Sequence, residues 1–159
     1  MLSLQITDIR EFMSQLLTGD TFDRFFLVEA QVTGGYSLTL DGRRNRDFYD
    51  TEDPKARDPF LSWGELKHLV FAAVRGNRLP LSMKIILALP DSTAAALISR
   101  VNSSEPREDI RGMYVNILYS RGSLRLTTGI SSTGFSLDRS LEYLFDDSVR
   151  NMLKRHDIL

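Results

Sequence analysis

The chain has 159 residues, of which 42% are hydrophobic and 26% charged, a balance typical of a globular protein. Its formal net charge of −1 provides neither the basic surplus nor the basic stripe expected of a protein that binds nucleic-acid phosphates. The absence of cysteine excludes disulfides, thiolate metal sites and thiol nucleophiles, and no apolar run is long enough to span a bilayer.

The first forty residues predict a helix followed by a β-hairpin. Apolar residues at helical spacing follow Asp8, which forms a capping-box-like pair with Glu11. Residues 26–40 then alternate between apolar and polar around Gly34 and Gly35, which can adopt the positive φ of a two-residue hairpin turn. In the first strand, the residues expected to share one face are Phe26, Val28, Ala30 and Val32.

The middle of the chain predicts a second helix and a central strand. Ser62 and Glu65 have the spacing of a capping box and mark the start of the helix. The stripe expected to be buried consists of Leu66, Leu69, Val70, Ala73 and Val74. In the strand predicted over residues 79–89, Ile86 and Ala88 make the second face apolar too, so we expect this strand in the middle of the sheet.

The last third of the chain predicts a third helix, a second hairpin and a final helix. Asp91 is expected to cap the third helix and Asp138 the final one. Between them, residues 113–132 indicate two strands that turn at Arg121 and Gly122. Apolar residues of the final helix step by three and four, so one face is apolar throughout.

The order of these elements favours an α+β fold. Hairpins dominate and the alternation of single strands with helices is poor, which favours a mostly antiparallel or mixed sheet. We expect the sheet to be built from two hairpins and a central strand and to be covered by about four helices. The length fits a single domain over residues 1–159.

The loop over residues 41–61 breaks all periodicity and is dense in charge. Between Asp41 and Asp58 it has five basic and six acidic residues. One interpretation is an anion site, in which guanidinium groups bind phosphate or carboxylate and an aromatic ring stacks. The other is a solvated loop whose charges cancel, and the near-zero net charge favours this second interpretation. The residues of the first interpretation are Arg43, Arg44, Arg46 and Tyr49.

Trp63 stands at the first turn of the helix that begins at Ser62. A tryptophan at this position either fills the edge of the core or anchors a partner, and the core is the default. If Phe60, Leu61 and Trp63 were all exposed, a protein interface would be the better interpretation.

Neither a metal site nor a cofactor is predicted. The two histidines, His68 and His156, are far apart in the sequence and form no zinc-binding pair. The acidic residues of the loop lack the spacing and the glycine of a calcium-binding loop. His68 lies off the apolar stripe of its helix, so we expect it at the surface, where a histidine is more often a bystander than a general base.

Four blocks of the sequence carry a family resemblance: "MLSLQITDIREFMSQLLTGDTFDRFFLVEA", "YSLTLDG", "RLPLSMKIIL" and "RLTTGISSTGFSLDRSLEYLFDDSV". They resemble a family of small proteins, chiefly from anaerobic Gram-positive bacteria, that is known only as a domain of unknown function. The resemblance runs along nearly the whole chain, which implies one domain. The family carries no assigned activity, so no residue gains a role from it.

Three functions are compatible with these sequence features. The favoured one is a non-enzymatic binding or assembly module of the bacterial cytoplasm, with a homodimer or another protein as partner and no membrane contact. The second is an enzyme or anion binder in which loop arginines meet Asp47, Tyr49 or His68 in one pocket. The least favoured is a nucleic-acid adaptor, whose basic patch would consist of Arg121, Arg125, Arg43 and Arg44.

Overall fold

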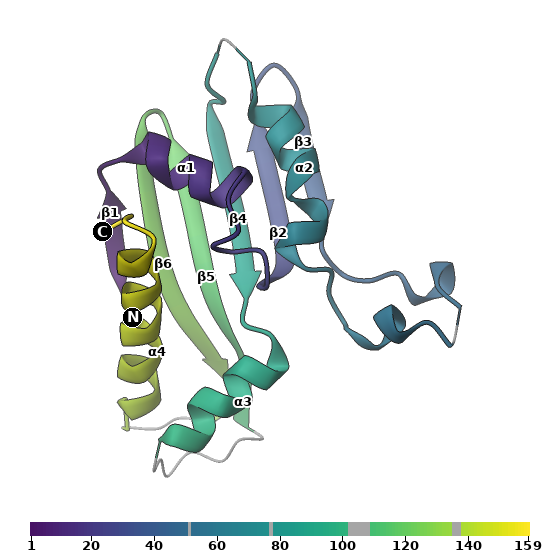
Figure 1. Cartoon of the computed structure of the whole chain (residues 1–159), viewed down its shortest axis with the longest axis vertical. Coiled ribbons are helices and arrows are strands. Elements are labelled where there is room, and N and C mark those ends of the chain that lie inside the picture. The colour runs from purple at the N-terminus through teal and green to yellow at the C-terminus, as the bar shows by residue number, and fades with distance from the viewer. Residues whose placement is uncertain (51, 77, 102–108, 135–137) are drawn as a thin grey trace.

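Figure 1 shows the computed structural model of the chain as a sheet with helices on one of its faces. The structure describes residues 1–50, 52–76, 78–101, 109–134 and 138–159. Within these residues, six strands form one sheet in the order β1-β6-β5-β4-β2-β3, and every neighbouring pair is antiparallel. The predicted α+β class is confirmed, and the sheet is antiparallel rather than mixed.

The strands are β1 (Ser3–Ile6), β2 (Phe26–Thr33), β3 (Ser37–Asp41), β4 (Ser82–Ala88), β5 (Ile110–Ser120) and β6 (Ser123–Ser132). The helices are α1 (Ile9–Leu17), α2 (Trp63–Val74), α3 (Asp91–Arg100) and α4 (Ser140–Arg155). Two short 3-10 helices, η1 (Arg46–Phe48) and η2 (Pro54–Arg57), lie in the loop between β3 and α2. Throughout the described part of the chain, no helix has the length and apolar character needed to cross a membrane.

The helices begin where the sequence places their caps, with small differences. The Asp8 side chain accepts a hydrogen bond from the Glu11 N–H at 3.1 Å and caps α1. Asp91 is the first residue of α3 rather than its cap, which is Pro90. Asp138 accepts from the Ser140 N–H at 2.9 Å and so satisfies one free donor at the start of α4.

Strand β1 was not predicted from the sequence. It has four residues, and it pairs with β6 near the other end of the chain, where Ser3 stands opposite Thr127. A segment this short carries too little alternation to indicate a strand by itself. Its place in the sheet depends on the distant partner.

The first hairpin differs from its prediction in its turn and in one strand. The turn covers Gly34 to Tyr36, and neither Gly34 nor Gly35 has the positive φ that a two-residue turn would require. A β-bulge between Leu27 and Glu29 inserts Val28 as an extra residue. Leu27 is therefore buried in the core, and Phe26 and Val28 are only half-buried.

The second hairpin has the predicted turn. Arg121 has φ 48° and Gly122 has φ 82°, the left-handed pair of a two-residue hairpin turn. Strand β4 lies between β2 and β5, so its predicted central position is confirmed. Its second face is nevertheless not closed, because Lys84 is exposed and Ile86 is only half-buried.

One hydrophobic cluster fills the space between the sheet and the helices. Trp63 is fully buried in it, and its indole N–H donates to the carbonyl of Leu16 at 2.7 Å. The polar atom of the ring is thus satisfied inside the core, and the first turn of α2 is joined to α1. Phe60 and Leu61, which precede this turn, are half-buried.

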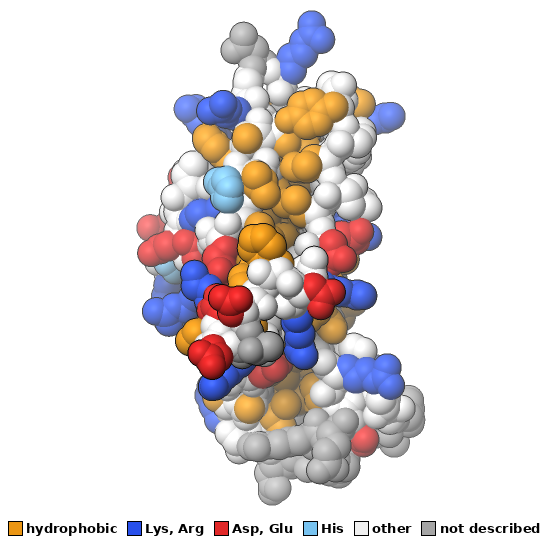
Figure 2. Space-filling model, turned by 90° about the vertical axis from the view of Figure 1, so that its right-hand side faces the viewer, with side chains coloured by type: hydrophobic (Ala, Val, Ile, Leu, Met, Phe, Trp, Pro, Cys, Tyr) orange, Lys and Arg blue, Asp and Glu red, His pale blue; other side chains and the backbone are white. Residues whose placement is uncertain are grey.

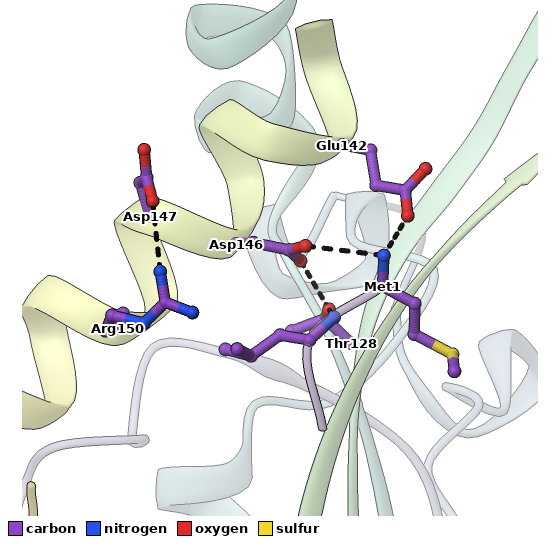
Figure 3. A network of polar contacts seen from close by, with 7 residues as sticks. Met1, Thr128, Glu142, Asp146, Asp147 and Arg150 are labelled. Atoms are coloured by element: carbon purple, nitrogen blue, oxygen red, sulfur yellow. Dashed lines mark hydrogen bonds and ion pairs between the residues drawn. The ribbon is translucent and has the colours of Figure 1, made fainter. Parts of the chain in front are cut away.

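A buried polar network ties the β1 edge of the sheet to α4 (Figure 3). The Leu2 N–H donates to Thr128 Oγ1 at 2.8 Å, and the Thr128 hydroxyl donates to Asp146 Oδ1 at 2.5 Å. The amino group of Met1 contacts Glu142 and lies 3.4 Å from Asp146 Oδ2. Thr128 and Asp146 are both buried, so this network satisfies polar groups that the core would otherwise leave unpaired.

Candidate functional site

The other edge of the sheet, at β3, presents leucine side chains beside helix α2. Leu38 and Leu40 stand opposite the buried residues Val32 and Ala30 of β2, so they point to the face that the helices cover. Both leucines are only partly buried, because β3 is the last strand in the sheet order. The apolar face of the sheet therefore continues to its open edge.

Helix α2 turns one flank toward α1 and the other toward β3. Lys67 marks the first flank, because its ammonium group contacts Asp23 at 2.7 Å and the carbonyl of Gly19 at 2.6 Å. The opposite flank carries apolar residues three and four positions apart, and Leu69 among them is 40% exposed. This corrects the expectation of a fully buried stripe: no described element packs beyond β3 to cover this flank. Its residues are Leu66, Leu69 and Ala73.

These side chains form a band on one face of the molecule. Figure 2 shows hydrophobic side chains gathered on the face that contains α2 and the outer edge of the sheet. Tyr36, at the tip of the β2–β3 hairpin, is 63% exposed and belongs to the same edge. A contiguous apolar patch on a folded chain is a candidate interaction site. The β3–α2 surface is defined here as Tyr36, Leu38, Leu40, Leu66, Leu69 and Ala73.

Within the described residues, the main chain of β3 presents hydrogen-bonding groups that no other strand pairs along this surface. The Gly42 N–H donates to the carbonyl of Val28 at 3.1 Å, and the Gly34 N–H donates to the carbonyl of Tyr36 at 2.9 Å. Even-numbered residues of the strand therefore face β2, because the direction alternates in an antiparallel pair. The N–H and C=O groups of the odd-numbered residues point away from the sheet. These residues are Ser37, Thr39 and Asp41.

Strand β3 lacks the devices that usually protect a sheet edge. It contains no lysine, no proline and no bulge, and its single charged residue, Asp41, stands at its end. Edge strands without such protection act as templates for another strand. The exposed backbone and the apolar flank thus offer the two kinds of contact that strand addition uses.

Arg44 holds the two ends of the 41–61 loop together. Its side chain is only 3% exposed, and its Nε–H donates to the carbonyl of Asp58 at 3.2 Å. Its Nη2 donates to the carbonyl of Phe60 at 3.5 Å and lies 3.8 Å from Glu65 Oε2. The guanidinium carbon lies 5.0 Å from the centre of the Tyr49 ring. The beginning of the loop, its end and the start of α2 are joined through this one side chain.

Glu65 is the carboxylate that balances Arg44. It accepts hydrogen bonds from the Ser62 N–H at 2.8 Å and from the Ser62 hydroxyl at 2.9 Å. Burial raises the pKa of Glu65, but these hydrogen bonds and the charges of Arg44 and Lys55 outweigh it, so the pKa lies below its usual value. Glu65 is therefore ionised at neutral pH and can pair with the loop.

Between its ends the loop projects from the body of the molecule (Figure 1). The side chains of Asn45 and Asp53 accept from the N–H groups of Asp47 and Lys55, so they cap the short helices of the loop itself. Phe48 in η1 is 82% exposed. Polar side chains of this segment thus stabilise the conformation of the loop itself.

The predicted surface residues occupy different environments. Arg43 and Arg46 are exposed in the loop, and His68 is exposed on α2. Trp63 is fully buried, and its ring fills the core. Arg44 is also buried, and its guanidinium donates to two backbone carbonyls and lies near the carboxylate of Glu65. The contact that the structure does provide within this set is that between Arg44 and Tyr49.

The arginines of the suggested basic patch lie apart. Arg125 is on β6, and Arg43 is the second residue after β3, with three strands between β6 and β3 in the sheet order. Strands are spaced by about 4.8 Å, so the separation across the sheet is roughly 19 Å. Over the described ranges of the chain, no group of three or more histidine and acidic side chains is arranged to hold a metal ion.

Sequence reasoning missed Tyr36, Leu38, Leu40 and Leu69 as surface residues. Their apolar character and periodicity are visible in the sequence, which places Leu69 in the buried stripe of its helix. The missing information was the position of β3 in the sheet, which depends on strand order rather than on the hairpin sequence. The lack of charge within "YSLTL" was the one local signal of an unprotected edge.

The fold and this surface define a two-layer α+β protein with one open, apolar sheet edge. The chain belongs to a family described as a family of unknown function (DUF5721), whose model matches residues 15–159. No curated protein and no solved structure matches the chain. The resemblance to a domain of unknown function is thus confirmed, and the family assigns no activity.

Proposed function

We propose that this chain is a non-enzymatic binding module that adds an extended protein segment to β3 and packs it against α2. The observation that carries this proposal is the outward-facing backbone of Ser37, Thr39 and Asp41 beside the half-exposed side chain of Leu69. Main-chain bonds to an edge strand supply affinity, and a neighbouring apolar surface supplies specificity. The cysteine-free composition suits a reducing compartment, so we place this activity in the bacterial cytoplasm.

The alternative of an anion site in the loop is less favoured. The guanidinium of Arg44 is buried, donates to two carbonyls and lies 3.8 Å from a carboxylate oxygen of Glu65, so its charge is balanced within the fold, although its Nη1 has no hydrogen-bond partner among the described residues. Arg43 and Arg46 remain exposed, but acidic residues of the same loop surround them in sequence. A phosphate site needs positive potential that is not cancelled in this way.

A matched pair of substitutions tests the proposal. Leu69→Lys places a charge on the β3–α2 surface, and Leu118→Glu does so on the open face of the sheet, where Leu118 is 43% exposed against 40% for Leu69. The new lysine lies one turn after Glu65 on α2, and the new glutamate stands opposite Arg125 of β6. Each new charge therefore has an opposite charge beside it. Both variants are therefore expected to fold.

The measurement is native mass spectrometry of each protein purified from its own host. We expect the wild type and Leu118→Glu to retain a second subunit, which is either another copy or another protein. Leu69→Lys should appear as the free chain of 18.1 kDa. Retention of the same subunit by Leu69→Lys, or free chains in all three samples, would rule the proposed surface out.

A further inference from the structure

We infer that the segment added to β3 is the β3 strand of a second copy, paired antiparallel about a two-fold axis at Thr39. This inference rests on the proposed function, because it names the partner of the same surface. A two-fold interface requires that one surface complement itself. The β3–α2 surface meets that requirement in its backbone, its side chains and its charges.

The backbone of β3 matches itself in this register. Thr39 of one copy stands opposite Thr39 of the other, and Ser37 stands opposite Asp41. All three are the residues whose N–H and C=O groups point outward, so each donor meets an acceptor across the axis. A shift of one residue would set outward-facing groups against residues bonded to β2 and would lose these bonds.

The side chains of β3 match themselves as well. With the axis at Thr39, Leu38 of one copy faces Leu40 of the other on the side covered by the helices. Direct neighbours across an antiparallel pair lie about 4.5–5.5 Å apart, which is contact distance for leucine side chains. The exposed flanks of the two α2 helices, with Leu69 in each, then border the same seam.

The charges favour this antiparallel arrangement. Asp41 is the single charge of β3, and it meets Ser37 of the second copy, whereas an in-register parallel pair would set Asp41 beside Asp41.

Single cysteines test the register, because the chain has none of its own. In the proposed pair the Thr39 Cα atoms lie about 5.5 Å apart, which a disulfide can bridge. The two Ser37 residues are offset by four positions along the strand, roughly 13 Å, which it cannot. Thr39→Cys and Ser37→Cys are both exposed replacements on the same strand, so they form a matched pair.

The experiment is oxidation of each purified variant, followed by non-reducing mass analysis, with circular dichroism to confirm the fold. We expect Thr39→Cys to form at least tenfold more covalent dimer than Ser37→Cys. Equal yields would indicate random collisions, and no dimer from Thr39→Cys would indicate no such pairing. Either result overturns the inference.

The two proposals fail in different ways. If Thr39→Cys stays unlinked while Leu69→Lys loses a different protein in the host experiment, β3 binds another chain and the self-pairing is wrong. If Thr39→Cys stays unlinked and no variant carries a second subunit, the β3–α2 surface is not a binding site and both are wrong.

Discussion

The two edges of the sheet, β1 and β3, end in different ways. Strand β1 has four residues, and the network of Figure 3 ties the adjoining Leu2 to α4 through Thr128 and Asp146. The Gln5 side chain folds back on the sheet and donates to Ser123 Oγ at 2.8 Å. Strand β3 has five residues and lies beside the partly exposed apolar flank of α2.

This difference separates an edge whose flanking residue is tied to a helix from one beside an exposed apolar flank. The bonds of Leu2 and Gln5 within the chain make β1 the poorer template for another strand. An open apolar edge that no partner covers promotes aggregation. Its presence in this chain therefore favours a role for this edge in binding. On the proposed function, the β1 edge contributes stability and the β3 edge association, and the following changes test that division.

Proline at each edge is expected to give the largest difference. Thr39→Pro removes an outward N–H and so deletes two symmetry-related hydrogen bonds of the dimer, while the pairing with β2 is kept. We expect the dimer dissociation constant to rise about 100-fold, or about 2.8 kcal/mol, measured by analytical ultracentrifugation. Ser3→Pro removes the equivalent outward N–H of β1 and should leave dissociation unchanged. Equal effects at both edges would contradict the division.

Thr128→Val is expected to destabilise the monomer. The substitution keeps the shape of the side chain but leaves the Leu2 N–H without an acceptor and removes the donor to Asp146 Oδ1. A buried group left unpaired costs about 1–3 kcal/mol, so we expect a loss of about 2 kcal/mol in the free energy of unfolding, measured in urea. The matched change on the open edge, Thr39→Val, should stay within about 0.5 kcal/mol. A comparable loss at Thr39 would show that β3 is as tightly integrated as β1.

Arg44→Met is expected to release the loop that follows β3. Hydrogen bonds to charged groups contribute about 1.5–3 kcal/mol, so we expect a loss near the low end, about 1.5 kcal/mol. Limited trypsin digestion should then cleave faster after Arg46, Lys55 and Arg57, because the loop ends are no longer joined. Arg43→Met, at an exposed neighbour, is the control and should leave the cleavage rate unchanged. Equal rates for both variants would show that Arg44 does not hold the loop.

Glu65→Gln is expected to have the smallest effect, and one that depends on pH. The pKa of Glu65 is lowered in the folded chain, so its stabilising contribution is complete above its usual pKa and is lost as pH falls through the folded value. Wild type should exceed Glu65→Gln by about 0.5–1 kcal/mol at neutral pH, because glutamine keeps the capping oxygen but loses the charge at the start of the helix, and by little in acid. Urea unfolding across this pH range measures the difference, with the exposed Glu52→Gln as a control. A gap that stays constant in acid would contradict the role of its charge.

The helices and hairpins could be predicted because their signals are local. Asp8 and Ser62 mark helix starts by their side-chain chemistry, and the Arg121–Gly122 turn needs the left-handed backbone that glycine favours. The bulge at Val28 could not be predicted, because one inserted residue shifts the faces of a strand without disturbing its composition.

The candidate site was harder to predict, because exposure is a property of the assembled sheet. Leu69 belongs to an apolar stripe like any other, and it is exposed because β3 is the last strand. Arg44 was identified as a notable residue, but its bonds are to backbone carbonyls of Asp58 and Phe60. Carbonyls have no signature in the sequence, so a buried structural arginine could not be distinguished from one that binds a ligand.

Strand β4 joins two hairpins that would otherwise not share a sheet. In the described sheet, the β2–β3 hairpin reaches β5 and β6 through β4, which the chain inserts between them after crossing over by α2. An isolated two-stranded hairpin is only marginally stable in water. If β2 separated from β4, the β2–β3 hairpin would therefore lose its ordered structure. A partner that binds β3 would favour the state in which β2 is paired with β4. It would therefore stabilise the β2–β4 pairing without contacting β4.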